Sequence, residues 1–245
     1  MVPAADVPDP SGAGPAYDVV VLAGGAARRL GGADKPALAV GGRALLDRVL
    51  AACAGAAATV VVGPRRPTAR PVRWAREEPP GGGPLPALAA GLAELDRLGA
   101  GSGTAVRPGV VVVLAADLPF LTSSTVAALA GTALRPPGTA LRPGGVRPDG
   151  PDGRDGVLLV DAAGRDQPLA AAYRVEPLRR ELALLRGEHG GLAGLPLRLL
   201  VGELAVGRLP DPGAEAFDCD TWEDVAAARS RLGDCEGDGE GPGSG

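Results

Sequence analysis

The sequence of 245 residues contains no asparagine and no isoleucine, and only one glutamine, Gln167. Lysine is equally rare, because Lys35 is the single lysine among 25 basic residues. A bias against residues with AT-rich codons is typical of a GC-rich genome, so much of the arginine, alanine, glycine and proline is compositional background. A residue type that this background disfavours is therefore more informative wherever it does occur.

Aromatic residues make up only 2% of the chain, so we expect a core of valine, leucine and alanine. Together with a formal net charge of −4, this scarcity argues against a nucleic-acid partner, which needs basic surfaces or base-stacking platforms. The cysteines Cys53, Cys219 and Cys235 form no CxxC pair and are odd in number, which argues against a disulfide framework or a zinc site. No apolar run approaches the ~18–20 residues of a membrane span, and residues 1–15 do not resemble a signal peptide. We therefore expect a soluble cytoplasmic protein that contacts no membrane.

Apolar runs of strand length alternate along the chain with segments of helical spacing. The expected strands are 17–22, 59–62, 72–74, 110–114, 156–160 and 168–173, and the expected helices are 43–54, 84–98, 122–129, 176–185 and 221–232. Fully apolar strands that alternate with helices are typical of a mostly parallel sheet covered on both faces. We expect one domain over residues 16–232, with disordered tails at 1–15 and 233–245 and a flexible Gly/Pro/Arg insertion at 135–155.

The segment 20–35, VVLAGGAARRLGGADK, is the first candidate site. A buried strand runs directly into Leu22-Ala23-Gly24-Gly25, and glycines there let backbone N–H groups approach a phosphate closely. Arg29 and Lys35 would add the positive charge that a triphosphate requires. The spacing fits neither GxGxxG nor a Walker A loop. A glycine-rich turn can also be background in a chain with 39 glycines, but the only lysine stands at its end.

The second candidate is Asp117, which follows the apolar strand 110–114 within the sequence Asp-Leu-Pro-Phe. Ligands of open α/β sheets bind at the carboxyl ends of the strands, and Mg²⁺ is commonly held by one or two carboxylates together with substrate phosphates. An Asp emerging from such a strand therefore suits a Mg²⁺ ligand. An ordinary turn-forming Asp before proline is the alternative for this residue taken alone.

Together these segments resemble a known family. Three segments are similar to motifs of nucleotidyltransferases of the sugar-nucleotide and molybdenum-cofactor group. They are the pattern LAGG, Arg, Leu-Gly and Lys over 22–35, the loop 117–120, and Gly-Pro-Leu at 83–85. The likeness is closest to molybdenum cofactor guanylyltransferases, which join GMP from GTP to molybdopterin. It extends to 167–173 and 218–225, and so covers about residues 16–231 apart from the insertion. It implies a single three-layer Rossmann-like α/β domain that uses Mg²⁺ as cofactor.

The chain departs from that family at three positions. Asp218 and Asp220 stand where the family has asparagines, and Gly63 stands where guanylyltransferases place an asparagine after the second strand. The change at Gly63 removes one expected polar contact to the nucleotide. LAGG itself is similar to the guanylyl-transferring members, whereas cytidylyl-transferring relatives more often have LAAG, and the small Gly25 leaves room for a purine.

The resemblance also implies roles for individual residues. Pyrophosphate would leave as the terminal phosphate of molybdopterin attacks the α-phosphorus of GTP. Glu77 and Glu78 precede the glycines 81–83, where the family has an acidic residue near the base, and we expect Glu78 to accept from guanine unless it is an exposed loop acid. The expected catalytic residues are Arg29 and Lys35; the expected nucleotide-binding residues are Leu22, Ala23, Gly24, Gly25, Lys35, Gly63, Glu78 and Asp117; and the expected Mg²⁺ ligands are Asp117 and Asp220.

GTP and molybdopterin are the implied substrates, with transient contacts to molybdoenzymes or cofactor-delivery proteins. Two alternatives stay open. The first is cytidylyl or other nucleotidyl transfer to molybdopterin, a sugar phosphate or phospholactate. The second is a non-catalytic nucleotide-binding relative, for which the departures at Gly63, Asp218 and Asp220 are the argument.

Overall fold

The computed structural model describes residues 16–25, 30–101, 107–134, 154–211 and 213–233. The N-terminal tail predicted at 1–15 lies outside the described residues. The same is true of the predicted C-terminal tail beyond Gly233 and of the predicted insertion up to residue 153.

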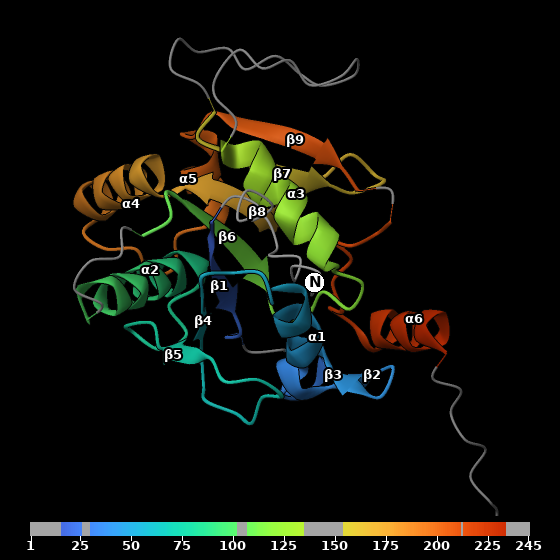
Figure 1. Ribbon diagram of the computed structural model, residues 1–245. Helices are drawn as coiled ribbons and strands as arrows, with labels where there is room; N and C mark the ends of the chain where they lie inside the picture. The colour runs from blue at the N-terminus through green and yellow to red at the C-terminus, as the bar shows by residue number, and fades with distance from the viewer. Residues whose placement is uncertain (1–15, 26–29, 102–106, 135–153, 212, 234–245) are drawn as a thin grey trace, which may run out of the picture.

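A seven-stranded sheet in the order β5-β4-β1-β6-β8-β7-β9 forms the centre of the molecule (Figure 1). The β5–β4, β4–β1, β1–β6 and β7–β9 pairs are parallel, and β8 runs antiparallel to both of its neighbours. This topology confirms the predicted α/β fold with a mostly parallel sheet. Its strands are β1 Asp18–Leu22, β4 Ala58–Val62, β5 Arg73–Ala75, β6 Val110–Ala115, β7 Gly156–Val160, β8 Asp166–Arg174 and β9 Val206–Pro210.

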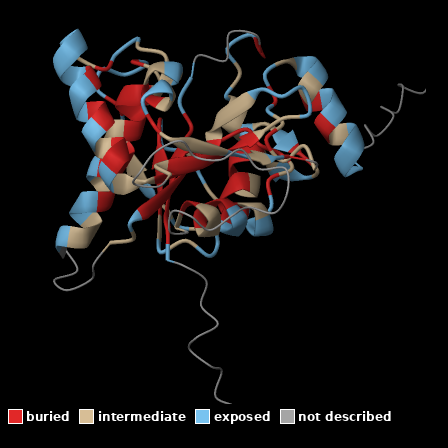
Figure 2. Ribbon diagram, turned by 90° about the horizontal axis from the view of Figure 1, so that it is seen from above, coloured by how far each residue is buried: buried red, intermediate tan, exposed pale blue. Residues whose placement is uncertain are grey.

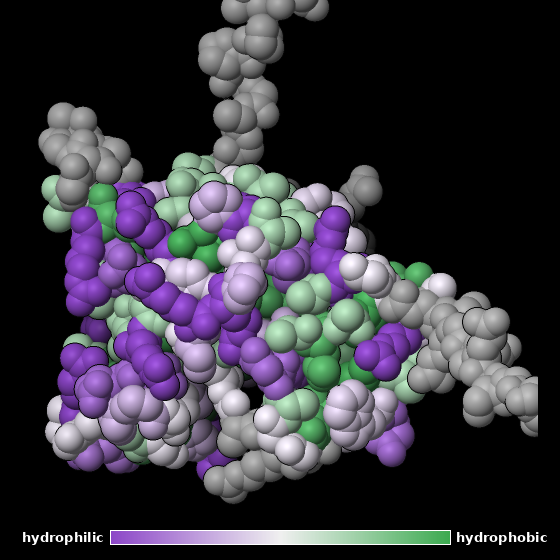
Figure 3. Space-filling model, turned by 90° about the horizontal axis from the view of Figure 1, so that it is seen from below, coloured by the Kyte–Doolittle hydropathy of each residue, from purple (hydrophilic) through white to green (hydrophobic). Residues whose placement is uncertain are grey.

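Helices cover both faces of this sheet and make the three predicted layers. Helices α1 (Leu45–Ala52) and α3 (Ser123–Leu134) pack on one face, and α2 (Pro84–Gly101), α4 (Val175–His189) and α5 (Leu197–Gly202) pack on the other. Figure 2 shows the buried residues gathered on the sheet and on the inner sides of these helices. On the face seen in Figure 3, hydrophilic residues alternate with small apolar patches.

Strand β1 explains why the central strands are apolar at every position. Val19 and Val21 point into the layer of α1 and α3, whereas Val20 points into the layer of α2, and all three are fully buried. Burial of each such side chain stabilises the fold by about 1.5–3 kcal/mol. Because both faces are covered, the strand carries no alternation of polar and apolar residues.

A smaller group of elements lies beside the central sheet and has its own cluster of buried side chains. It contains α6 (Trp222–Leu232), the short helix η3 (Lys35–Ala37) and a hairpin of β2 (Ala39–Val40) and β3 (Arg43–Ala44). The helix predicted over 43–54 therefore begins two residues late, since Arg43 and Ala44 pair with β2 across a turn at Gly41 and Gly42 whose φ angles are +60° and +66°. No helix within the described residues is long and apolar enough to cross a membrane.

Candidate functional site

The glycine-rich turn begins where β1 ends and lies between the carboxyl ends of β4 and β6. The N–H of Ala23 donates to the carbonyl of Val62 at 2.8 Å, and the N–H of Ala116 donates to the carbonyl of Leu22 at 3.1 Å. These bonds hold the turn at the edge of the sheet where α/β proteins bind ligands. The predicted residues Leu22, Ala23, Gly24 and Gly25 thus share this edge, whereas the predicted Arg29 lies outside the described residues.

Lys35 lies between two carboxylates that come from distant parts of the chain. Its Nζ forms an ion pair with Asp117, which follows β6, and donates to Oδ1 of Asp220 at 2.5 Å. Burial lowers the pKa of the Lys35 ammonium, but the Asp117 and Asp220 carboxylates outweigh burial and raise that pKa above its ordinary value. Three residues predicted separately from the sequence, one lysine and two aspartates, therefore form a single charged cluster.

Asp218 joins this cluster, and the sequence did not assign it as a ligand. Carboxylate oxygens of Asp117, Asp218 and Asp220 all lie within 4.8 Å of one another. Burial raises the pKa of Asp218, and the neighbouring Asp220 and Asp117 raise it further. A set of three close carboxylates fits Mg²⁺, which prefers hard oxygen ligands. The signal in the sequence is the spacing of two, because alternate residues of an extended segment point to the same side.

The loop that carries Asp218 and Asp220 is held at the residue between them and at the residue that follows them. The N–H of Cys219, which is fully buried, donates to the carbonyl of Asp117 at 3.3 Å. Immediately afterwards Thr221 caps α6 in a capping box whose partner is Asp224: the Asp224 N–H donates to Thr221 Oγ1 at 3.2 Å, and Asp224 accepts from the Thr221 N–H at 2.7 Å. These three bonds fix the direction in which the loop presents its carboxylates.

Glu77, rather than Glu78, is the carboxylate that lies beside the glycine turn. Glu78 is exposed, whereas Glu77 is 8% exposed and accepts from the N–H of Gly81 at 3.0 Å. A Cβ on Gly24 would lie 3.5 Å from Oε1 of Glu77. The other oxygen, Oε2, is buried and has no hydrogen-bond partner among the described residues. A buried carboxylate oxygen without a donor is costly, so this oxygen suits a donor supplied by a ligand.

Gly63 stands at the closest approach between the end of β4 and the glycine turn. Its N–H donates to the carbonyl of Ala75 at 3.0 Å, and its φ is +145°. A Cβ at this position would lie 2.8 Å from the carbonyl carbon and oxygen of Ala23, and 3.0 Å from the nitrogen of Gly24. An asparagine would not fit at position 63 in this chain, because the backbone of the glycine turn occupies the space that its side chain would need.

Arg66 is a further residue of the site that the sequence did not single out. Its guanidinium lies between the turn and the segment that leads to Lys35, where it donates to the carbonyl of Ala23 and to the carboxylate of Asp34. Among 24 arginines (25 basic residues less one lysine) nothing in the sequence distinguishes it. The site therefore combines a glycine turn, one ammonium, a guanidinium, three clustered carboxylates and a buried glutamate.

Comparisons with known proteins point to one family. The family model described as the MobA-like NTP transferase domain matches residues 19–200. A molybdenum cofactor guanylyltransferase of Rhodopseudomonas palustris is 33% identical over 177 residues, which cover 70% of this chain and 72% of that protein. A second one, from Acidiphilium cryptum, is 39% identical over 92 residues, which cover 34% of this chain and 44% of that protein.

Two solved structures have a similar fold. The molybdopterin-guanine dinucleotide biosynthesis protein A of Archaeoglobus fulgidus gives a TM-score of 0.59 at 20% identity, covering 89% of this chain and 100% of that one. The 2-C-methyl-D-erythritol 4-phosphate cytidylyltransferase of Thermus thermophilus gives a TM-score of 0.57 at 18% identity, covering 89% and 98%. At these identities the two structures bear on the fold alone.

Proposed function

The chain belongs to the MobA-like NTP transferase family, and from that premise we propose that it transfers GMP from GTP to the phosphate of molybdopterin and releases pyrophosphate. The observation that carries the proposal is the contact of Lys35 with Asp117 and Asp220 beside the glycine turn. A phosphate-binding turn, a fixed ammonium and a cluster of carboxylates are the parts that transfer at a phosphorus atom requires.

The described residues divide this work between binding and charge stabilisation. The molybdopterin phosphate is already anionic, so the reaction needs no general base, and catalysis rests on position and on neutralised charge. Backbone N–H groups of Gly24 and Gly25 hold the nucleotide, because the N–H of Ala23 already donates to Val62, and Lys35 neutralises charge that develops on the α-phosphate. Arg29 adds a second positive charge from the same segment.

Mg²⁺ is the cofactor that we propose for the carboxylate cluster. Asp117 and Asp220, with Asp218 beside them, would hold it, since their oxygens lie within 4.8 Å of one another. When bound, the ion neutralises the nucleotide phosphates. Lys35 already pairs with two of these carboxylates, and its flexible side chain can turn from them toward the phosphates.

The choice of base rests on a glutamate. Guanine offers the N1–H and N2–H₂ donors that a carboxylate accepts, whereas cytosine offers only an amino group on its pairing edge. Glu78 was our expectation from the sequence, but its exposure favours the neighbouring Glu77, whose buried Oε2 has no donor among the described residues. We therefore assign base reading to Glu77, which favours GTP over CTP.

A pyrophosphate-release assay with each nucleoside triphosphate, with and without molybdopterin, tests this function. We expect release from GTP with Mg²⁺ only when molybdopterin is present, and we expect Asp117→Asn to abolish Mg²⁺-dependent GTP binding in calorimetry. Release from CTP, or with a sugar phosphate or phospholactate as acceptor, would replace the proposal by that transfer. Nucleotide binding without release under every combination would identify a non-catalytic relative. Cytoplasmic location and transient contacts with molybdoenzymes or cofactor-delivery proteins belong to the same proposal.

A further inference from the structure

Arg66 contacts both sides of the segment that carries the proposed phosphate site. Its Nη1 donates to the carbonyl of Ala23 at 3.3 Å. Its Nη2 donates to Oδ1 of Asp34 at 2.8 Å, and its Nε donates to Oδ2 of the same carboxylate at 3.2 Å. One guanidinium thus joins the residue that opens the glycine turn to the residue that precedes Lys35.

The strength of the ion pair between Arg66 and Asp34 depends on how far the guanidinium is buried. The Arg66 side chain is 11% exposed and the Asp34 side chain 53% exposed, so the ion pair is covered on the arginine side only. A planar fork that bonds both oxygens of one carboxylate fixes direction as well as distance, which an ammonium cannot do. Because the arginine is almost covered, removing its partner would leave a buried charge whose remaining contact, within the part of the chain that the structure describes, is the carbonyl of Ala23.

Asp34 connects Arg66 to Lys35 through the backbone. The carbonyl of Asp34 accepts from the N–H of Ala37 at 2.8 Å, and the carbonyl of Lys35 accepts from the N–H of Leu38 at 3.1 Å, so Asp34 begins the short helix η3. At the other contact, the N–H of Ala23 is held by β4 while its carbonyl is held by Arg66. The guanidinium therefore joins the first residue of the turn to the residue that precedes Lys35.

We propose that Arg66 is a positioning residue, which holds Lys35 at the correct distance from the phosphate-binding turn. This inference rests on the function proposed above, and it adds a residue that itself contacts neither the carboxylate cluster nor Glu77 among the described contacts. The role concerns the phosphate end of the nucleotide. Base recognition, which we assign to Glu77, should be independent of Arg66.

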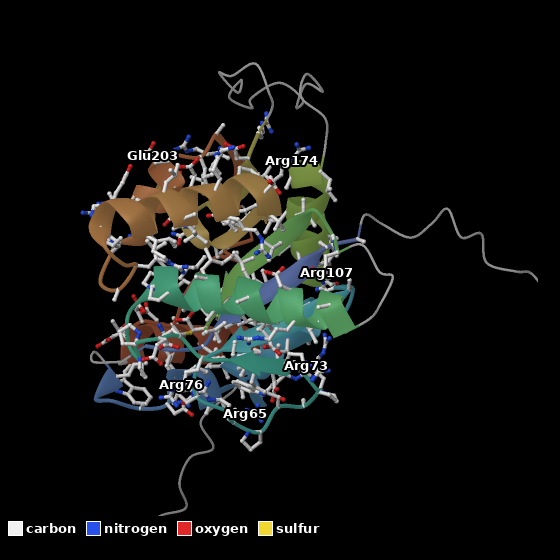
Figure 4. The ribbon with its side chains drawn as sticks, turned by 90° about the vertical axis from the view of Figure 1, so that its left-hand side faces the viewer. Arg65, Arg73, Arg76, Arg107, Arg174 and Glu203 are labelled. Atoms are coloured by element: carbon white, nitrogen blue, oxygen red, sulfur yellow. The ribbon has the colours of Figure 1, made fainter. Side chains whose placement is uncertain are left out.

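Three variants test the role against a matched control. Arg66→Ala, Arg66→Lys and Asp34→Ala are compared with Arg65→Ala, since Arg65 is the next residue and lies exposed at the surface, as Figure 4 shows. We expect Arg66→Ala to lower kcat for GMP transfer by about a hundredfold, as a displaced catalytic group does, while the affinity for GMP changes less than about threefold. Arg66→Lys should restore little of this loss, because an ammonium cannot form the fork. Arg65→Ala should match the unmodified protein.

A double-mutant cycle separates the positioning role from general loss of structure. If Arg66 acts through Asp34, the double variant should be no slower than Arg66→Ala alone, and the coupling should appear in kcat rather than in the affinity for GMP. Additive losses, or a loss of GMP affinity equal to the loss of kcat, would overturn the inference. So would an Arg66→Ala variant as active as Arg65→Ala.

Amide hydrogen exchange without any ligand gives a readout that does not depend on the proposed reaction. We expect faster exchange at 23–25 and at Lys35, Ala37 and Leu38 in Arg66→Ala and in Arg66→Lys, but not in Arg65→Ala. If the unmodified protein transfers no nucleotide to any acceptor, the proposed function fails. If the unmodified protein transfers GMP while exchange and kcat are unchanged in Arg66→Ala, only the role of Arg66 fails.

Discussion

At the scale of single residues, Lys35 has the most demanding position in the chain. Its ammonium touches Asp117 and Asp220, which keep its pKa above the ordinary value, so it stays charged at neutral pH. We expect Lys35→Ala to lower kcat for pyrophosphate release by about 10²–10³-fold, the usual cost of removing one donor that stabilises charge in a transition state. Lys35→Arg should recover little of this activity, because a planar guanidinium does not replace a compact ammonium between two carboxylates.

The binding of Mg²⁺ without nucleotide provides an independent control for this prediction. The ammonium of Lys35 competes with a cation for Asp117 and Asp220, so Lys35→Ala should bind Mg²⁺ more tightly than the unmodified protein in a calorimetric titration. Retained cooperative thermal unfolding would show that the fold persists. Near-normal turnover by the alanine variant would remove Lys35 from the mechanism.

The buried glutamate gives a second prediction at this scale. Inosine triphosphate lacks the N2 amino group of GTP, so the difference between the two substrates reports the bond to that group. We expect the unmodified protein to prefer GTP in kcat/KM by about tenfold or more, the value of one hydrogen bond to a charged acceptor. Glu77→Gln should reduce this preference, and the exposed Glu78→Gln should leave it unchanged. The opposite pattern would return base reading to Glu78.

Rarity singled out Lys35, and its place after a recognisable strand singled out Asp117; the structure places these two residues in contact. Glu77, Asp218 and Arg66 were not assigned, since nothing local separates a buried loop acid or a bonded arginine from an exposed one. Glu77 lies close to the turn at Gly24, where an added Cβ would be 3.5 Å from its Oε1. Such contacts between distant segments are properties of the folded chain.

At the scale of elements, strands buried on both faces were the easiest to predict. β1, β4 and β6 carry continuous valine and leucine runs, and their predicted bounds agree with the structure to within one residue. β9 was not predicted, because its residues are half-buried or exposed and it ends at Pro210. It forms a strand only by pairing in parallel with β7, a contact that its own sequence does not indicate.

The junction of β4 with the glycine turn allows a test of one glycine. We expect Gly63→Ala to lower the free energy of unfolding by about 2–4 kcal/mol, because the new Cβ meets the backbone of Ala23 and the φ of +145° disfavours any side chain. Gly164→Ala is the matched control, since its φ is +78° and nothing lies within 4 Å of its Cβ, so it should cost only about 1–2 kcal/mol. Urea unfolding measures both. Equal losses would show that the turn can move away from β4.

At the scale of the whole molecule, the sheet order brings the site together. Segments near residues 23, 63, 77 and 117 meet because β1 lies between β4 and β6, and the loop at 218–220 arrives from the far end of the chain. The alternation of strands and helices predicted a parallel sheet but could not predict this order. Asp220 reaches Lys35 across 185 residues, and the resemblance to the family was what indicated it.

The reactivity of two buried thiols can report how often the contact between the loop at 218–220 and Asp117 opens. Burial raises the pKa of Cys53 to about 12, and burial with the nearby Asp117 raises the pKa of Cys219 to about 12. Near pH 8 both thiols should therefore react with a disulfide reagent only when the protein opens, because the thiolate is the reactive form and both side chains are fully buried. Cys235→Ser removes the remaining thiol, and Cys53→Ala or Cys219→Ala then leaves a single reporter.

Cys219 should respond to the ligands of the site. Exposure of the Cys219 thiol requires the loop at 218–220 to move away from Asp117. Bound GTP and Mg²⁺ must therefore dissociate before the thiol reacts. With free ligand at a hundred times its Kd, we expect Cys219 to react about a hundredfold more slowly. The reaction of Cys53, at the end of α1, should slow by the same factor only if this thiol becomes accessible through global unfolding. If Cys219 reacts at the same rate with and without ligand, the loop at 218–220 does not take part in binding, and the cluster with Asp117 has no role in holding the nucleotide.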